Sequence, residues 1–425
     1  MSILFMFLIL FALLIVGVPV AVSLGVASLI FILLEGIPSI VVLHNMVNGV
    51  NSFTLIAIPF FILAGHLMNT GGITNRIFAF ARSLVGWLPG GLGHVNVGAS
   101  VIFAGMSGAA VADAGGLGNV EIKAMKDAGY DTDFSVGITA ASSTIGPIIP
   151  PSLPLVIYGV MADTSIGQLF AAGLVPGLLM AFALMIMVSW FAKVRNYPRD
   201  DRFKFNVLLA SFKKAFLPLM TPVIIVGGIS TGVFTPTEAA VAAVAYSIFL
   251  GLCVYRTLSF NNILKVSQET IETTASILMI VATSTIFAWI LTANQFAAFF
   301  AENLLSFTDN KVLILLIMTL LVLIIGCFME TIAAITILVP VLLPVAIQIG
   351  IDPVHFGIIL ILNLMLGLLT PPVGMVLYVL AKVSETPFER CVVATAPFLV
   401  PLVSVLLLLT FIPSISMWLP SLIYR

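Results

Sequence analysis

Charged residues are scarce in this sequence. Only 8% of its 425 residues are Asp, Glu, Lys or Arg, and the formal net charge is −1. The first basic residue is Arg76. The N-terminal apolar segment therefore lacks the positive region of a cleaved signal peptide, and we expect it to remain in the mature protein. Because there is no basic arm either, nucleic acid is not an expected partner.

Residues that commonly carry out catalysis or bind metals are also few and scattered. The three cysteines and four histidines lie far apart, so they predict neither a disulfide framework nor a metal cluster. No acid pair, Ser/His/Asp set or phosphate-binding loop occurs at catalytic spacing. The sequence therefore predicts neither an enzyme nor an ATP-driven pump.

Apolar residues are abundant, at 61% of the chain with a mean hydropathy of +1.22. A soluble globule of this composition could not cover its surface with polar groups. The apolar runs have the length of helices, and a bilayer admits only helices or closed barrels because backbone polar groups must pair internally. We expect an all-α polytopic membrane protein.

The chain contains an internal duplication. Residues 146–152 and 367–373 interrupt apolar segments in the same Gly/Pro-rich way and lie 221 residues apart (367 − 146). This pattern predicts two repeats, over residues 1–192 and 216–425, joined by a linker over residues 193–215. The same shift superimposes further residues: Gly105 on Gly326, Gly129 and Asp131 on Gly350 and Asp352, and Pro176 on Pro397.

The distribution of basic residues predicts the topology. The linker holds the densest cluster of charge and is assigned to the cytoplasm by the positive-inside rule. Counting spans outward from it leaves only Lys311 and Arg425, of the 17 basic residues, on the outer side. Each half contributes five crossings, an odd number, so the two copies must have opposite orientation. We expect an inverted repeat of about ten spans plus two re-entrant hairpins, with both termini on the outer face.

Each half is predicted to contain the same order of elements. The first half has a helix pair (3–17, 20–34), a span (53–69), a surface stretch around Arg76, a hairpin (95–125), a broken helix (134–158) and a span (166–191). The second half has a pair around Thr235 to Glu238, a span (275–291), a surface stretch (294–310), a hairpin (312–348), a broken helix (355–380) and a span (392–411). Glu238 is predicted to cap the N-terminus of a helix.

The two interruptions are the predicted ion sites. Their prolines remove N–H donors and free carbonyl groups one turn earlier, at membrane depth. Ser143 and Gly146 lie at the first break, and Gly367 and Thr370 at the second. Carbonyl and hydroxyl oxygens suit Na⁺, and paired breaks of this kind mark the site of secondary transporters. The alternative is that the prolines only shape packing.

The turns of the two hairpins carry the other candidate residues. Ser107 could lend an oxygen to a cation, and the helix N-terminus near Gly108 could bind an anionic substrate. Asp113 and Glu330 are acids at membrane depth, where charges are costly and usually functional. The alternative for both acids is capping of a hairpin helix or a local pair.

Four motifs in order resemble the large membrane subunit of tripartite ATP-independent periplasmic (TRAP) transporters over essentially the whole chain. They are Gly105 to Gly108 with Asp113, residues 143–152, Thr235 to Glu238, and residues 367–374. The resemblance implies a bacterial inner-membrane transporter in which Na⁺ drives uptake of an organic acid, of the C4-dicarboxylate or sialic acid class. It also implies a periplasmic binding protein that delivers the substrate, a separate small four-helix membrane subunit, and elevator movement of the hairpins and broken helices. Within the family, the sialic acid branch is the most similar.

The resemblance also implies roles for individual residues. The first Na⁺ site would be formed by Ser107, Gly146, Pro150 and Pro151, and the second by Glu330, Gly367 and Thr370. The substrate would be bordered by Ser107, Gly108, Asp113, Ser143 and Glu330. Thr370 occupies the position that Ile149 has in the first break, so the two sites need not be chemically equal.

Three alternatives stay open at this stage. The same architecture could work alone as a Na⁺/dicarboxylate symporter, and transport without a binding protein would identify it. A channel would conduct without saturation or Na⁺ coupling. An intramembrane enzyme would need an acid pair or a nucleophile set within the spans.

Overall fold

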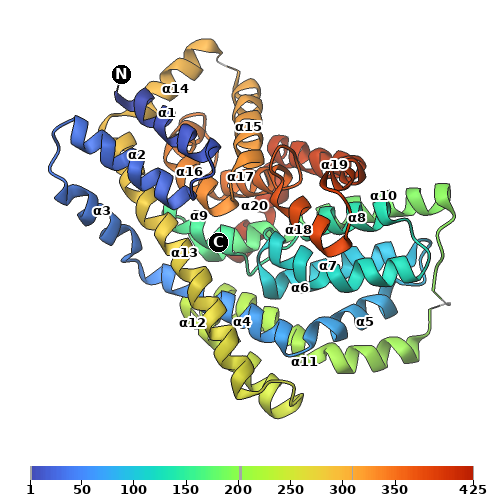
Figure 1. The fold of residues 1–425 in the computed structure, drawn as a ribbon. Helices are drawn as coiled ribbons and strands as arrows, with labels where there is room; N and C mark the ends of the chain where they lie inside the picture. The colour runs from blue at the N-terminus through green and yellow to red at the C-terminus, as the bar shows by residue number, and fades with distance from the viewer. Residues whose placement is uncertain (1, 201–202, 309, 425) are drawn as a thin grey trace.

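Helices joined by short loops make up the part of the chain that the structure describes (Figure 1). The structure is a computed structural model that describes residues 2–200, 203–308 and 310–424, without the side chains at positions 2, 107, 297, 305 and 307. Within these residues, eight helices are long and apolar enough to cross a membrane. The expected all-α polytopic architecture is confirmed.

The first half begins with an antiparallel pair and ends with a long helix. The helices are α1 (Ser2–Ile15), α2 (Val20–Leu34), α3 (Ile40–Val50), the 3₁₀ turn η1 (Phe53–Ile56), α4 (Ala57–Thr70), α5 (Ile73–Val85), α6 (Gly91–Ser107), α7 (Ala110–Asp127), α8 (Thr132–Ser143), α9 (Leu153–Met161) and α10 (Ile166–Arg195).

The second half has the same order. Its helices are α11 (Phe205–Ser230), α12 (Pro236–Phe249) with the π-turn η2 (Leu250–Val254), α13 (Phe260–Ala293), α14 (Phe296–Phe307), α15 (Lys311–Phe328), α16 (Thr331–Gln348), α17 (Pro353–Gly367), α18 (Met375–Ser384), α19 (Phe388–Phe411) and α20 (Ser414–Ile423).

The helix boundaries repeat with the shift found in the sequence. Helix α7 begins at Ala110 and α16 at Thr331, which are 221 residues apart (331 − 110). Gly129 and Gly350, in the loops that follow these helices, both have positive φ, at 84° and 73°. That backbone conformation favours glycine in both copies. The duplicated punctuation therefore reflects a duplicated structure.

Some elements differ from the prediction. Helices α3 and α20 were not predicted, because each is too short to be recognised from the sequence as a membrane span. Where α3 and α4 are interrupted by residues 51–56, the equivalent α13 runs unbroken for 34 residues. The prediction of an amphipathic linker over 193–215 stays untested; in this region α10 continues to Arg195 and α11 begins at Phe205.

Local sequence signals account for the helix ends. The Thr235 hydroxyl accepts from the Glu238 N–H at 3.3 Å, and the Glu238 carboxylate accepts from the Thr235 N–H at 2.8 Å. This reciprocal pair is a capping box, and the expected capping role of Glu238 is confirmed.

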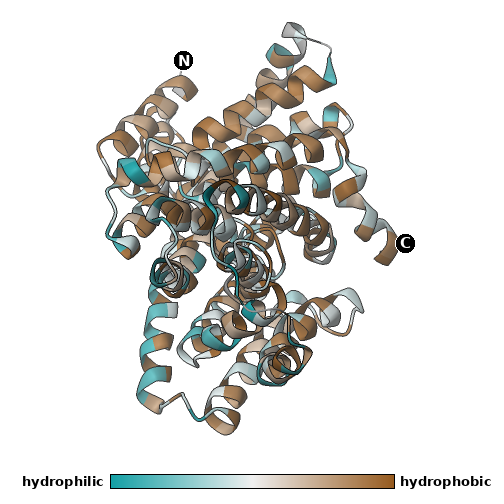
Figure 2. Ribbon diagram, turned by 90° about the vertical axis from the view of Figure 1, so that its right-hand side faces the viewer, coloured by the Kyte–Doolittle hydropathy of each residue, from teal (hydrophilic) through white to brown (hydrophobic). Residues whose placement is uncertain are grey.

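The two repeats are interlocked in space. Helix α7 of the first hairpin packs on α18, and α16 of the second hairpin packs on α9. Helix α8 packs so closely on α19 that a Cβ at Gly137 would lie 2.2 Å from the Ala394 carbonyl oxygen. Hydrophobic residues predominate along the helices (Figure 2). The hairpins and broken helices thus form one core built from both halves of the chain.

Candidate functional site

Each repeat contains an interrupted helix at the predicted Gly/Pro-rich segment. In the first, α8 ends at Ser143 and α9 begins at Leu153. In the second, α17 ends at Gly367 and α18 begins at Met375. Both Pro-Pro bonds, Pro150-Pro151 and Pro371-Pro372, are cis, which the sequence alone did not indicate.

The turn of each hairpin lies against the break of its own repeat. Gly108 has φ +59°, and a Cβ there would lie 2.8 Å from the Pro151 carbonyl oxygen. In the second repeat, a Cβ at Gly367 would lie 2.4 Å from the carbonyl carbon of Gly326. The Val373 N–H also donates to the Cys327 carbonyl at 3.2 Å. Glycine at Gly108 therefore lets the first hairpin turn approach the first break closely, and glycine at Gly326 and Gly367 lets the last turns of α15 and α17 approach each other closely.

A small cavity of about 90 Å³ lies between the two hairpin turns and the two breaks. Glu330 and Thr331 of the second hairpin and Ala109 and Ala110 of the first line it. The remaining lining residues come from the breaks and their flanking helices, with two more from the hairpins: Val111, Pro147, Leu153, Pro154, Ile332, Met365, Leu368 and Met375. Four segments that are remote in sequence thus converge on one small cavity.

Glu330 is the predicted acid that reaches this cavity. It is the N-cap of α16, and its Oε2 accepts from the Ile332 N–H at 2.9 Å and from the Ala333 N–H at 3.2 Å. Glu330 therefore caps a hairpin helix, which is the alternative role that the sequence left open for it. The second carboxylate oxygen takes no part in either of these bonds.

The hydroxyl groups around the first break are buried and bonded. Ser143 Oγ donates to the Ala140 carbonyl at 2.8 Å, and Thr144 Oγ1 donates to the Ala141 carbonyl at 2.6 Å. Ser142 Oγ donates to Asn96 Oδ1 at 2.6 Å. Because each hydroxyl donates its proton to these hydrogen bonds, its oxygen lone pairs remain available to a cation.

The two breaks differ in exposure. Residues 144–152 are buried throughout, whereas Pro371 and Pro372 are exposed and Thr370 is half-buried. Thr370 Oγ1 donates to the Leu366 carbonyl at 2.7 Å. The two predicted sites therefore have the same backbone plan but different surroundings.

The other predicted site residues differ in where they lie relative to the cavity. Gly146, Pro150 and Pro151 lie in the first break, next to the cavity-lining Pro147. Ser107 is the last residue of α6, and its side chain lies outside the described part of the structure. Asp113 is 1% exposed within the first hairpin and is not among the residues that line the cavity.

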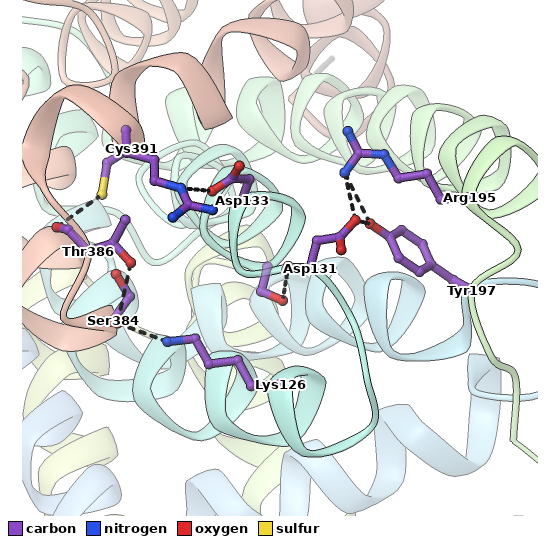
Figure 3. Close-up of polar contacts among 10 residues, drawn as sticks. Lys126, Asp131, Asp133, Arg195, Tyr197, Ser384, Thr386 and Cys391 are labelled. Carbon is purple, nitrogen blue, oxygen red and sulfur yellow. Dashed lines mark hydrogen bonds and ion pairs between the residues drawn. The ribbon is translucent and has the colours of Figure 1, made fainter.

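A polar network ties one end of the first hairpin to the second repeat and to the linker (Figure 3). Lys126 donates to the Ser384 carbonyl at 2.8 Å. The Tyr197 hydroxyl and Arg195 both donate to Asp131, at 2.6 and 2.9 Å. The hydrogen bond from Tyr197 lowers the pKa of the Asp131 carboxyl most, and Arg195 lowers it further. Basic residues that the topology assigned to one side therefore lie together.

Further ion pairs extend this network. Arg82 of α5 makes a two-pronged pair with Asp200 of the linker, at 2.7 and 2.8 Å. Arg390 of α19 donates to Asp133 at 2.6 Å. Sequence reasoning missed these partners because they are up to 257 residues apart.

Two hairpins packed against two interrupted helices in a duplicated membrane chain are the arrangement typical of a membrane transporter. The family described as "Tripartite ATP-independent periplasmic transporter, DctM component" matches residues 7–415, and the chain belongs to this family. It is 50% identical over 411 residues to the sialic acid TRAP transporter large permease protein SiaM of Vibrio cholerae serotype O1, covering 96% of each chain.

Two further proteins are similar to this one. The sialic acid TRAP transporter permease protein SiaT of Haemophilus influenzae is 44% identical over 409 residues, which cover 96% of this chain and 66% of that protein. The crystal structure of the Alcanivorax borkumensis YdaH transporter matches with a TM-score of 0.67 and 14% identity, over 89% of this chain and 88% of that one. The latter likeness concerns the fold alone.

Proposed function

We propose that this chain is the permease through which a Na⁺ gradient drives uptake of an organic acid, with sialic acid as the substrate. The identity to the sialic acid permease of Vibrio cholerae, 50% over 96% of both chains, supports this choice. The C4-dicarboxylate permease of Pseudomonas aeruginosa is 40% identical, so C4-dicarboxylates form the second substrate class.

The observation that carries the proposal is the convergence of both hairpin turns and both breaks on one cavity. Free carbonyl and hydroxyl oxygens at membrane depth can replace the hydration shell of Na⁺. We assign the first Na⁺ site to Ser107, Gly146, Pro150 and Pro151. The second site is assigned to Glu330, Gly367 and Thr370.

The substrate site is assigned to Ser107, Gly108, Ser143 and Glu330, next to the cations. Na⁺ bound at both breaks would offset the negative charge of Glu330 and of the substrate carboxylate. Asp113 is left out of this site because it lies inside α7, near Ser100 of α6, and not in the hairpin turn.

The hairpins and broken helices are proposed to move together as one rigid body during transport. Their interlocked packing, α7 on α18 and α16 on α9, favours motion as a unit. Small residues also let this body approach its surroundings closely: a Cβ at Gly105 would lie 2.7 Å from Pro222 of α11. An elevator movement would slide such contacts without unfolding a helix.

Two partners complete the proposed system. A periplasmic binding protein delivers the substrate, and a separate small four-helix membrane subunit accompanies the permease. The family description, which names a tripartite transporter, favours this reading over a stand-alone symporter. The proposed location is the bacterial inner membrane with both termini in the periplasm.

Reconstitution tests the proposal. The permease and the small subunit are placed in proteoliposomes, and labelled sialic acid is supplied with its binding protein under an inward Na⁺ gradient. Accumulation is expected only with the binding protein and the gradient. Uptake without the binding protein would favour the stand-alone symporter, and accumulation that ignores Na⁺ would exclude sodium as the driving ion.

A further inference from the structure

Helix α7 of the first hairpin carries two buried acids. Asp113 is 1% exposed and Glu121 is 2% exposed. They are eight residues apart, a spacing that keeps both on the buried stripe of one helix. Asp113 was predicted as a site residue from its place after the hairpin turn, whereas Glu121 was not, although the eight-residue spacing is visible in the sequence.

Neither acid has the partners that a buried carboxylate needs. Both oxygens of Asp113 and the Oε1 of Glu121 are buried without a hydrogen-bond partner. Ser100 of α6 lies near Asp113, and Asp113 lies close enough to Glu121 to act on it electrostatically. Two adjacent unpaired charges would each cost several kcal/mol in such a place.

No basic side chain reaches them from the described residues of the surrounding helices. Helix α7 packs on α6, α8 and α18, and Gly116 lies near Asn69 of α4. His94 of α6 contacts Ser189 at 3.2 Å, and Asp133 of α8 pairs with Arg390. The other titratable groups on these helices, together with the α8 N-cap Asp131, are exposed or paired elsewhere: His66 of α4, Tyr378 and Lys382 of α18, and Lys123, Lys126 and Asp127 of α7.

The stretch of α7 between the two acids packs against methyl groups. Between the two acids, a Cβ at Gly118 would lie 2.9 Å from the Thr139 methyl carbon and 3.6 Å from a Leu380 methyl carbon. The Thr139 hydroxyl is already bonded to Asn96 and to the Ser135 carbonyl. A metal cation needs several oxygens around it, whereas a proton needs only the carboxyl that carries it.

We propose that Asp113 and Glu121 form a proton-binding pair within the first hairpin, distinct from the two proposed Na⁺ sites. Each carboxyl takes up one proton from water and becomes a neutral acid that can donate its own hydrogen bond. The hairpin then packs without a buried net charge. Release of these protons as the pH rises puts charge into the hairpin and weakens its packing.

Infrared spectroscopy of the purified protein tests the pair without any transport measurement. The C=O stretch of a protonated carboxyl is separate from that of a carboxylate, and it shifts in heavy water. Asp113→Asn and Glu121→Gln should each remove part of this band at neutral pH. Asp127→Asn, an exposed acid on the same helix, is the matched control and should leave the band unchanged. An unchanged band in both test variants would overturn the proposal.

A second measurement covers a variant that fails to fold. The wild-type band is followed as the pH is raised, and its gradual loss is expected. Absence of a protonated-carboxyl band in the wild-type protein at neutral pH would overturn the proposal by itself.

The consequence for transport rests on the proposed function. Wild-type uptake should fall as the pH rises, whereas the double variant Asp113→Asn/Glu121→Gln should keep its uptake at high pH, within about twofold of its neutral value. Its Na⁺ concentration for half-maximal uptake should equal that of wild type. A raised Na⁺ requirement would mean that these acids bind Na⁺, and the proton assignment would be wrong. If the wild-type protein shows no Na⁺-driven uptake, the proposed function fails while the infrared result still decides the proton pair.

Discussion

The contact between Gly367 and Gly326 offers a direct test of the second Na⁺ site. In Gly367→Ala, the new Cβ would lie 2.4 Å from the Gly326 carbonyl carbon and 2.7 Å from its Cα and oxygen. Ordinary contacts begin at 3.4 Å, so the C-terminal turns of α15 and α17, which lead into the hairpin turn and the break, must separate by about 1 Å. Backbone lies on both sides, and no flexible side chain can absorb the shift.

The size of the effect follows from this overlap. Overpacking of a close contact costs about 1–3 kcal/mol, which corresponds to about a 5- to 150-fold change in an equilibrium constant. If Na⁺ binds only when the ends of α15 and α17 are in contact, the Na⁺ concentration for half-maximal uptake should rise within this range. The assay is uptake in proteoliposomes at varied Na⁺, alongside thermal unfolding of the purified protein.

Gly227→Ala of α11 is the matched control, because a Cβ there meets nothing within 4 Å. It should keep wild-type Na⁺ dependence, and a helical Ala is favoured over Gly by up to about 1 kcal/mol. A Gly367→Ala protein that folds and shows unchanged Na⁺ dependence would refute the idea that this contact forms the site.

Three further predictions can be checked separately. Thr370→Ala removes one oxygen at the second break, so the half-maximal Na⁺ concentration should rise about fivefold, the factor for about 1 kcal/mol, while Thr370→Ser should retain wild-type behaviour; equal effects of both substitutions would exclude the hydroxyl as a ligand. Asp131→Asn should lower the stability by at most about 1 kcal/mol, because its partners are exposed. Since Tyr197 and Arg195 lower the pKa of Asp131, this contribution is present above the ordinary Asp pKa and lost as the pH falls through the lowered one, so a stability difference that persists in strong acid would contradict it. Single cysteines at Lys204 and Lys311 should be labelled from opposite sides of the membrane, and an impermeant reagent that reaches the first but not the second from outside would reverse the topology.

Much of this architecture could be predicted from local patterns. Helix α16 begins 221 residues after α7, as the spacing of the two Gly/Pro interruptions required. The capping box at Thr235 and Glu238 was also visible, because its partners are three residues apart. Helices α3 and α20 were missed, since a short apolar helix has no length signal that separates it from a loop.

Candidate residues were harder to judge from the sequence. Glu330 reaches the cavity and caps α16, so the functional and structural readings meet in one side chain. Asp113 was expected beside the substrate, yet it is buried in the hairpin near Glu121 and does not line that cavity. The spacing of residues along a helix shows which of them share a face, but not which helix that face meets.

The sequence by itself determined the class, the duplication and the positions of the two breaks, because hydropathy, glycine and proline act on neighbouring residues. Only the tertiary structure decided that both hairpin turns meet both breaks around one cavity. It also decided that the first break is buried while Pro371 and Pro372 are exposed, and that Asp113 and Glu121 are both buried in the first hairpin. These outcomes depend on contacts between segments that are remote along the chain, and no local pattern encodes them.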